Sequence, residues 1–573
     1  MTFAKRLLPF GLAAVLAASA AAVPTLVLAA PAGPQKGPTA MVAAAEPDAV
    51  DAGLKVLKAG GSAVDAAVAI QAVLGLEEPQ SSGLGGGSFM TYYDAKTRQV
   101  TAYNGRETAP AGATPELFYG PNGRPMPKGE AIVGGRSAGV PGAVAMLHLA
   151  QSQHGKLAWK DLFGDAERLA AEGFHVPARM AAAAASNAPQ AKQPDAIAYF
   201  TKPDGTKIQA GEVMKNPAYA ATLRRLAAEG PKAILEGPIA AEIVAKLHEG
   251  PYPSAMTLKD LASYKPKATP AVCRPYREYT VCTPPAPSGG PAVLEGLGIL
   301  ARTDIDQHPN DVQGWYLFSQ ASRLMYADRD RYYGDPDFVD VPMEGLLAAD
   351  YLDARARLIS PDKAGPPPGP GNPKGAGVRA PDRTKEPGGT THFVIVDKDG
   401  NAVSMTTTVE SIFGDGKMVG GFFLNNQLTD FSFQPKDQDG APAANAPAGG
   451  KRPRSSMAPA IVLDKQRRFV AGAGSPGGPS IIAFNLKVLV GLLDWKVTPQ
   501  EAVALPNLIA FDTVYASEPA KFPAGVVAGL AAKGVAVRGG PFGEGSGEQA
   551  IKMTPNGLQG GADPRREGVA KGY

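Results

Sequence analysis

Apolar residues in the first half of the chain recur at helical spacing, in stretches that end at glycine. Residues 46–61 carry apolar positions three and four apart and stop at Gly60, and residues 62–79 repeat the pattern behind a Ser62 cap. Five more stretches are predicted to be helical: 141–155, 159–173, 216–230, 311–333 (one long amphipathic helix) and 479–495 (a buried helix). The first part of the chain, from Met41 to about Pro270, is therefore expected to be mostly helical.

Strand patterns dominate later in the chain. Residues 88–105 alternate like a hairpin, and two more hairpins are expected over residues 391–410, around the turn at Gly400, and over residues 458–474. The Pro/Gly-rich stretch 364–389 has little apolar content and is expected to be exposed and mobile. Strands flanked by helices on both sides predict stacked sheets in an α/β arrangement.

The N-terminus has the layout of a secretory signal. Two basic residues precede an uncharged run over residues 7–35 that is rich in Ala, Leu and Val. Cleavage after Ala20 or after Ala30 would fit, and we take residues 1–30 as the signal peptide. A retained membrane anchor is the less favoured alternative because two prolines interrupt the run. The mature protein is therefore expected to be periplasmic or secreted.

Composition argues against several classes of function. Lys plus Arg number 57 against 54 for Asp plus Glu, giving a net charge of +3, so no nucleic-acid partner is expected. The six histidines show no metal-binding spacing, and no metal or organic cofactor is expected. The two cysteines, Cys273 and Cys282, flank a predicted hairpin, which indicates a disulfide in an oxidising compartment.

The stretch PGGTTHFVIVDKDG, residues 387–400, raises a chemical possibility. If the chain is cut between Gly389 and Thr390, the threonine gains an α-amino group with an ordinary pKa of about 7.7–8.0. That amine can take the proton of the threonine's own hydroxyl, which makes one residue both nucleophile and base. The doubled glycine would permit the twisted backbone that internal attack requires. Without further support, β-propensity alone explains the doubled threonine.

Support comes from motifs spread along the chain. It resembles the γ-glutamyltransferase (glutathione hydrolase) family of N-terminal nucleophile hydrolases over everything after about residue 40. The motifs that carry the resemblance occur in order, together with the 389–390 junction and DPRREGVAKGY at the C-terminus: LGGGSFM at 84–90, NGRETAP at 104–110, PPAPSGG at 284–290, LNNQLTDF at 424–431, KRPRSSMAP at 451–459 and GSPGG at 474–478.

The resemblance implies a fold and a processing event. The fold would be the four-layer αββα sandwich of that class, in the α/β (α+β) group. Self-cleavage would give a large chain, residues 31–389, and a small catalytic chain, residues 390–573, which remain together as a heterodimer.

The resemblance also assigns roles to the reacting groups. Thr390 would be the nucleophile and Thr408 would hydrogen-bond to it. Gly477 and Gly478 would offer backbone N–H groups to the tetrahedral oxyanion.

Five further residues would hold the substrate. Arg106 would bind its α-carboxylate through the guanidinium fork, with hydroxyl contacts from Ser455 and Ser456. Gln427 and Asp430 would receive the α-ammonium. Together they favour a γ-glutamyl amide such as glutathione as acyl donor, with water or an amino acid as acceptor.

Two details depart from the bacterial pattern. Glu410 stands two residues after Thr408, where an asparagine is usual, and is expected either to contact the α-ammonium or to change acyl selectivity. The loop over residues 432–453 has no tyrosine, so the pocket is expected to be more open.

Alternatives therefore remain. A related glutaryl or cephalosporin acylase, or a poly-γ-glutamate depolymerase, would keep the nucleophile and change the head-group contacts. An exported amino-acid- or peptide-binding protein, or an uncut pseudoenzyme, would need no cleavage at Thr390.

Overall fold

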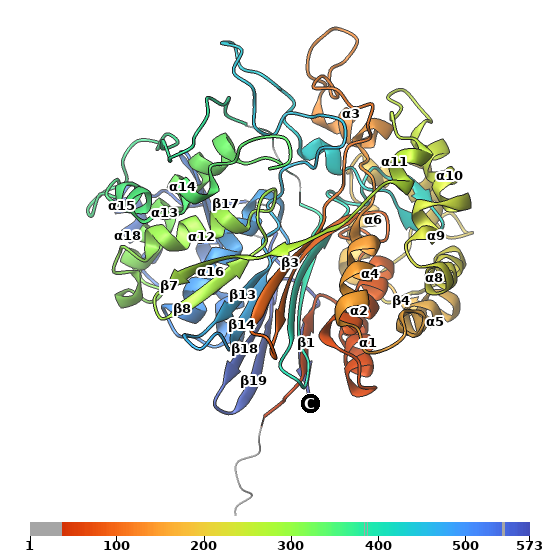
Figure 1. The fold of residues 1–573 in the computed structure, drawn as a ribbon, viewed down its shortest axis with the longest axis horizontal. Coiled ribbons are helices and arrows are strands. Elements are labelled where there is room, and N and C mark those ends of the chain that lie inside the picture. The colour runs from red at the N-terminus through yellow and green to blue at the C-terminus, as the bar shows by residue number, and fades with distance from the viewer. Residues whose placement is uncertain (1–36, 383, 385, 387, 541–544) are drawn as a thin grey trace, which may run out of the picture. The chain divides into compact units, whose positions relative to one another are not determined.

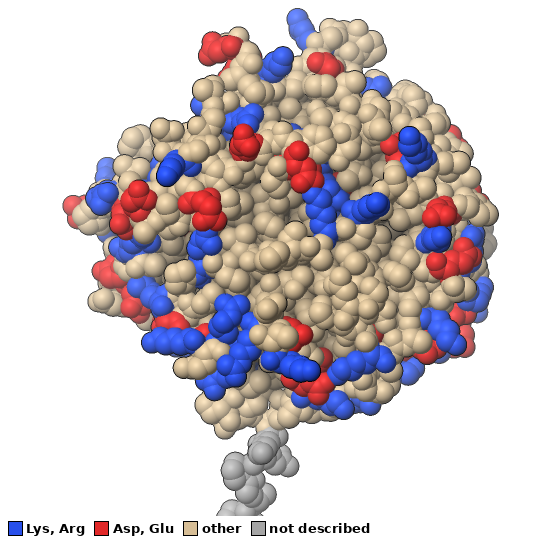
Figure 2. Space-filling model, viewed as in Figure 1, with Lys and Arg blue, Asp and Glu red and all other residues tan. Residues whose placement is uncertain are grey.

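The computed structural model describes residues 37–382, 384, 386, 388–540 and 545–573 (Figure 1). The expected signal peptide, residues 1–30, lies outside the described residues and stays a prediction. Within the described ranges, no helix combines the length and the apolar character that crossing a membrane requires. On the face shown in Figure 2, basic and acidic side chains are interspersed.

Two antiparallel sheets stack at the centre of residues 37–573. The first has the strand order β20 (Val569–Gly572), β1 (Met41–Ala44), β9 (Thr390–Val396), β10 (Ala402–Thr408), β2 (Gly87–Asp94), β3 (Gln99–Gly105), β6 (Lys267–Pro270). The second has the order β19 (Gly557–Ala562), β18 (Gln549–Thr554), β14 (Phe469–Gly474), β13 (Ala460–Leu463), β8 (Tyr279–Thr283), β7 (Val272–Tyr276). Buried side chains such as Val394, Ile461 and Ile551 fill the space between them.

Helices cover both outer faces of this pair of sheets (Figure 1). On the side of the first sheet lie α1 (Pro47–Lys58), α2 (Ala63–Glu77), α4 (Ala143–His154), α5 (Gly164–Glu172), α6 (Ala178–Ala185), α7 (Pro194–Phe200), α8 (Pro217–Glu229), α9 (Lys232–Leu235), α10 (Gly237–Leu247) and α11 (Leu258–Ala262). On the side of the second lie α12 (Gly290–Leu300), α13 (Val312–Tyr332), α14 (Met343–Leu346), α15 (Ala349–Ala356), α16 (Ile481–Leu493), α17 (Pro499–Ala504) and α18 (Val526–Ala532). The expected four-layer αββα sandwich is confirmed.

Smaller elements complete the described chain. They are α3 (Lys128–Val133), the two-stranded pairs β4 (Phe174–His175) with β5 (Val213–Met214) and β11 (Met418–Val419) with β12 (Phe422–Phe423), and the three-stranded sheet of β15 (Leu508–Phe511), β16 (Val514–Ser517) and β17 (Arg538–Gly539).

Most helix predictions are confirmed, with shifted ends. Ser62 caps α2 as expected: its Oγ accepts a hydrogen bond from the Asp65 N–H at 3.2 Å, and the Asp65 carboxylate accepts from the Ser62 N–H at 2.9 Å. The helix expected over residues 159–173 begins only at Gly164, because Trp159–Leu162 forms a separate 3-10 turn.

The helix α13 is single, as expected, but it is not amphipathic. Its buried residues occupy every side and include the charged Arg323, Asp328 and Arg329. It contacts α12, α18 and β15, so its polar side chains find partners inside the protein instead of water.

The expectation that residues 364–389 are exposed is wrong at five described positions. Pro373, Ala380, Asp382, Glu386 and Gly389 are buried. Asp382 accepts a hydrogen bond from the Asn445 side chain at 2.9 Å, and Glu386 accepts one from Arg329 at 2.6 Å. Composition predicted a solvated linker, whereas its carboxylates are bound to buried donors of the core.

Two hairpins position groups that the sequence singled out. In the β7–β8 hairpin, Cys273 pairs with Cys282, and their sulfur atoms are bonded at 2.04 Å. In the β9–β10 hairpin, the register pairs Thr390 with Thr408 at the open end of two adjacent strands. Both strands are buried along their whole length, which gives the threonine pair a rigid support.

Candidate active site

The hydroxyl of Thr390 belongs to a short relay at the start of β9. It donates to Thr408 Oγ1 at 3.1 Å, and Thr408 Oγ1 in turn donates to the carbonyl oxygen of Gly389 at 2.6 Å. The backbone N–H of Glu410 donates to the same Thr408 hydroxyl at 2.8 Å, which fixes its orientation. In the uncut chain, Thr408 thus joins the proposed nucleophile to the carbonyl that it would attack.

Crowding explains why glycine precedes Thr390. A Cβ on Gly389 would lie 2.6 Å from the carbonyl oxygen of Glu410, whereas the nearest atom that a Cβ on Gly388 would meet among the described residues is 3.9 Å away. The φ angle of Gly389 lies outside the left-handed region, so close approach, not unusual backbone freedom, is the structural reason for glycine at this position.

The loop that contains Gly477 and Gly478 lies beside this junction. Both residues have positive φ angles, of 135° and 56°, and a Cβ on Gly477 would lie 2.6 Å from the ring of Phe484. The ideal Cβ position of Gly388 is 4.0 Å from the Gly478 nitrogen. Among the described residues the donor to the Gly389 oxygen is Thr408, so the oxyanion role of the two glycines stays a prediction.

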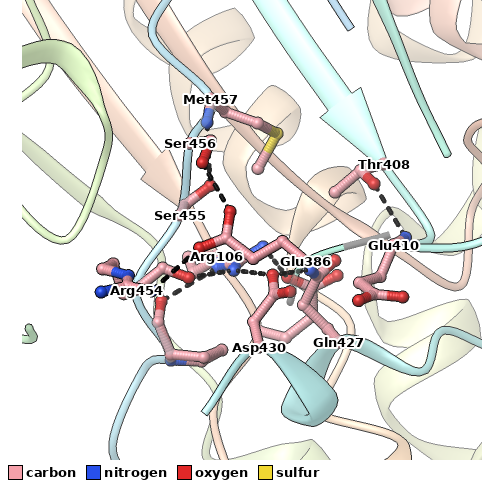
Figure 3. A network of polar contacts seen from close by, with 12 residues as sticks. Arg106, Glu386, Thr408, Glu410, Gln427, Asp430, Arg454, Ser455, Ser456 and Met457 are labelled. Carbon is pink, nitrogen blue, oxygen red and sulfur yellow. Dashed lines mark hydrogen bonds and ion pairs between the residues drawn. The ribbon is translucent and has the colours of Figure 1, made fainter. Parts of the chain in front are cut away.

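Arg106 and Asp430 form a buried ion pair. Arg106 Nη2 lies 2.6 Å from Asp430 Oδ2 and also donates to the Arg454 carbonyl oxygen at 2.6 Å. Gln427 Nε2 donates to the same Asp430 oxygen at 2.7 Å. The two residues expected to bind opposite ends of a zwitterion are thus bound to each other (Figure 3).

Of the two serines, Ser456 binds a carboxylate, and that carboxylate belongs to the chain itself. Ser456 Oγ donates to Glu386 Oε2 at 2.5 Å, and Arg329 Nη2 donates to both Ser456 Oγ and Glu386 Oε1 at 2.6 Å. Arg454 Nη2 lies 3.2 Å from the same Glu386 oxygen. Ser455 Oγ accepts a hydrogen bond from the Met457 N–H at 3.1 Å.

The contacts with the two arginines determine the protonation state of Glu386. Burial alone would raise the pKa of Glu386, but the guanidinium groups of Arg329 and Arg454 outweigh burial and lower the pKa to about 2. Glu386 is therefore ionised at neutral pH. Figure 3 shows its side chain among Arg106, Arg454 and Ser456.

Glu410 faces the opposite side of the site. Its carboxylate accepts from Asn426 Nδ2 at 2.5 Å and from Thr429 Oγ1 at 3.2 Å, and its backbone has a φ of 82°, which is strained for a residue other than glycine. Burial, and then the neighbouring Asp430 charge, hold the pKa of Glu410 well above its usual value. Glu410 does not share a carboxylate site with Arg106; it forms an acidic pair with Asp430.

The predicted residues converge on one small cavity of about 20 Å³. Its lining joins Arg106, Thr390, Thr408, Glu410, Gln427, Asp430, Ser455, Ser456 and Gly478 with Glu386, Met457 and Ile481. Gly477 instead lines a neighbouring cavity of about 680 Å³, together with Gly388 and Gly389.

Three groups that contact residues of the candidate site were not predicted from the sequence. Glu386 fell in a segment expected to be exposed and mobile, and Arg329 fell in a helix expected to be amphipathic. Arg454 lies inside the KRPRSSMAP motif, so its position beside the two serines was the one signal in the sequence that could have identified it.

Comparisons with known proteins match most of this chain. The family model described as Gamma-glutamyltranspeptidase matches residues 49–573. A glutathione hydrolase proenzyme of Bacillus subtilis (strain 168) is 37% identical over 486 residues, which cover 82% of this chain and 81% of that protein. One of Escherichia coli (strain K12) is 34% identical over 83% of this chain and 81% of its own length.

A solved structure is similar over nearly the whole fold. The cephalosporin acylase from Bacillus halodurans superimposes with a TM-score of 0.82 at 26% identity, covering 95% of this chain and 98% of that one. The family match spans the threonine relay, the Arg106–Asp430 pair and the serine pair described above. The chain therefore belongs to the gamma-glutamyltranspeptidase family.

Proposed function

We propose that this protein cuts its own chain between Gly389 and Thr390 and then transfers γ-glutamyl groups from glutathione or related amides to water or an amino acid. The observation that carries the proposal is the relay from the Thr390 hydroxyl through Thr408 to the Gly389 carbonyl oxygen, at 3.1 and 2.6 Å. A binding protein would have no use for a hydroxyl held against the preceding carbonyl.

Self-cleavage begins with attack of Thr390 Oγ on the Gly389 carbonyl carbon. A bond forms between these atoms, the Gly389–Thr390 amide bond breaks, and the Thr390 nitrogen takes up a proton to become an amine. Thr408, which donates to the carbonyl oxygen, stabilises the negative charge that develops there. Water then hydrolyses the ester, which leaves a carboxylate on Gly389 and restores the Thr390 hydroxyl.

Catalysis uses the amine that cleavage releases. The α-amino group of Thr390 takes the proton of its own hydroxyl while Oγ attacks the γ-amide carbon of the substrate. The amine product leaves with a proton, and an acyl ester on Thr390 remains. Water or the amino group of an acceptor amino acid attacks that ester, and the Thr390 hydroxyl is regenerated.

The neighbouring cavity of about 680 Å³ offers room for the departing amine and for the acceptor. Its lining includes Gly388, Gly389, Gly477, Arg179 and Arg566. Arg566 also donates to the carbonyl oxygen of Thr390 at 3.0 Å. This guanidinium beside the released α-amine would favour the amine's neutral, basic form.

Binding of the γ-glutamyl ammonium is supported by two buried acceptor atoms. Asp430 Oδ1 and Gln427 Oε1 line the site and accept no hydrogen bond from the described residues. An ammonium group is a triple donor and would satisfy both. Glu410, on the same side, would add charge when it is ionised.

A glutaryl-type amide is the second candidate donor. A glutaryl group keeps the carboxylate of a γ-glutamyl group and lacks the α-ammonium. The superposition on a cephalosporin acylase over 95% of the chain favours keeping this candidate. The hollow of about 730 Å³ lined by Lys128, Phe433 and Lys436 would accommodate a bulky substrate.

The two products of cleavage, residues 31–389 and 390–573, should remain one heterodimer. In the first sheet, β1 of the large chain lies between β20 and β9 of the small chain, and β10 of the small chain pairs with β2 of the large one. Neither chain could keep this sheet alone. Export to the periplasm or the medium rests on the predicted signal peptide.

The test is intact mass and N-terminal sequencing of the purified protein. The wild type should give two chains, the smaller beginning Thr-Thr-His-Phe, and Thr390→Ala should give one. Thr391→Ala, an equal truncation of the next buried threonine, should still be cut. A folded, uncut wild-type chain would overturn the mechanism, and a cut enzyme inert toward γ-glutamyl and glutaryl anilides would overturn the substrate assignment.

A further inference from the structure

The carboxylate of Glu386 occupies the place where the family resemblance puts a substrate carboxylate. It is 5% exposed and accepts hydrogen bonds from Ser456 and Arg329, with Arg454 at 3.2 Å. The site is built from three buried donors that come from α13 and from the strand-free segment after the 432–453 loop. Such charge-assisted contacts are the strong ones in proteins.

The two arginines are almost completely removed from water. Arg329 is 2% and Arg454 is 1% exposed. Apart from Glu386, their anionic partners are Asp330 and, for Arg454, Asp382 at 3.4 Å. Asp382 and Glu386 both belong to the segment that precedes the proposed cut. If that segment withdraws, two buried guanidinium groups share one remaining carboxylate, which strongly favours a new anion.

The small cavity beside Thr390 in the uncut chain is consistent with replacement of Glu386 by a substrate anion after cleavage. With Glu386 in place, the cavity beside Thr390 measures about 20 Å³, which holds about one water molecule and no acyl group. Glu386 is four residues before Thr390, so cleavage leaves it close to a free chain end. Chain ends are the least constrained parts of a fold.

We propose that Arg329 and Arg454, with Ser456, bind the acyl-group carboxylate of the substrate in the processed enzyme, and that Glu386 occupies this site in the precursor as an internal ligand. The inference rests on the proposed function for its substrate class, which is an amide whose acyl group ends in a carboxylate. It adds two specificity-determining residues to Arg106, whose fork is already engaged by Asp430 and the Arg454 carbonyl.

Three anilides separate carboxylate recognition from everything else. γ-Glutamyl p-nitroanilide carries carboxylate and ammonium, glutaryl p-nitroanilide carries the carboxylate alone, and 4-aminobutyryl p-nitroanilide carries the ammonium alone. In the processed enzyme, Arg454→Met should raise KM about ten- to a hundredfold for the first two, the loss expected for a charge-assisted contact, and less than twofold for the third. Arg454→Lys should recover part of the loss.

Arg331→Met is the control for the loss of a guanidinium group near the site. Arg331 lies on the same helix as Arg329, two residues beyond it. This variant should leave all three KM values unchanged. An equal effect of Arg454→Met on all three anilides, or no effect on any, would overturn the inference. Two chains on a gel show that each variant has folded and been processed.

Calorimetry with free glutarate tests the precursor without relying on turnover. The uncut Thr390→Ala chain should not bind glutarate, Thr390→Ala/Glu386→Ala should bind it, and adding Arg454→Met should abolish that binding. Equal binding with and without Glu386 would contradict the inference. If the wild type is cut but hydrolyses none of the anilides, the proposed function fails, and the glutarate measurements still decide the role of Glu386.

Discussion

Thr408 lies directly opposite Thr390 across the central strands β9 and β10, and its hydroxyl bridges the Thr390 hydroxyl and the Gly389 carbonyl oxygen. The bridge depends on the antiparallel register, because a shift of one residue would turn Thr408 to the other face of the sheet. The strand pairing thus places a hydrogen-bond donor on the carbonyl that Thr390 is proposed to attack.

Loss of the Thr408 hydroxyl should therefore slow self-cleavage. We expect Thr408→Val to cut about a hundredfold or more slowly, the usual effect of removing one donor from a developing oxyanion, and Thr408→Ser to cut at nearly the wild-type rate. The measurement is the fraction of uncut chain over time. Thr407→Val is the control, because the Thr407 hydroxyl donates to the Gly87 carbonyl at 3.3 Å, away from the junction. Wild-type cleavage in Thr408→Val would rule out this role.

The two glycines before the cut should differ in their tolerance of a side chain. Gly389→Ala would place a methyl group 2.6 Å from the Glu410 oxygen, so we expect it to displace the scissile peptide and to leave most of the chain uncut. Gly388→Ala has no neighbour closer than 3.9 Å and should be processed normally. Mass spectrometry after overnight incubation distinguishes them. Equal processing of both variants would show that crowding at Gly389 is unimportant.

The sequence predicted the fold, and which residues line one cavity, better than the contacts among those residues. Periodicity identified helices such as α1, α2 and α8, and the β9–β10 hairpin, because each buries a continuous apolar face. It could not show that α13 is buried on all sides, since its charged residues are neutralised by distant partners. For the same reason Glu386 was expected to be solvated, because its three donors, Arg329, Ser456 and Arg454, lie 57 to 70 positions away in the sequence.

Glu410 gives a pH-dependent prediction. Burial and the Asp430 charge raise its pKa, so at low pH it is neutral and resembles glutamine. As pH rises toward that pKa it ionises and attracts the substrate ammonium. The ratio of wild-type to Glu410→Gln kcat/KM for γ-glutamyl p-nitroanilide should therefore increase with pH. Taking the ratio cancels the titration of the Thr390 amine, which both enzymes share.

Glutaryl p-nitroanilide is the control for this prediction, because it lacks an ammonium group. Its ratio should not increase with pH. If the ratio of wild-type to Glu410→Gln kcat/KM does not change with pH for either substrate, Glu410 does not contact the ammonium. Its role would then be structural, through its hydrogen bonds with Asn426 and Thr429.

Asp415 should make the folded state sensitive to pH. It is fully buried, and burial raises its pKa from 3.8 to about 7, although Lys417 partly offsets the shift. Between these values the native state binds more protons than the unfolded state, so the free energy of unfolding falls as pH rises. Over pH 5 to 8 the loss should be about 2 to 3 kcal/mol, at about 1.4 kcal/mol for each pH unit up to the folded pKa.

Asp415→Asn isolates this contribution, because asparagine stays neutral and can still accept the Lys417 N–H hydrogen bond, which is 2.9 Å long. Urea unfolding at pH 5 and pH 8, in the uncut Thr390→Ala background so that one chain unfolds, gives the comparison. The stability of Asp415→Asn should fall less with pH than that of its parent. The exposed Asp439→Asn should behave like the parent, and identical pH slopes for all three would show that Asp415 is already ionised in the folded protein.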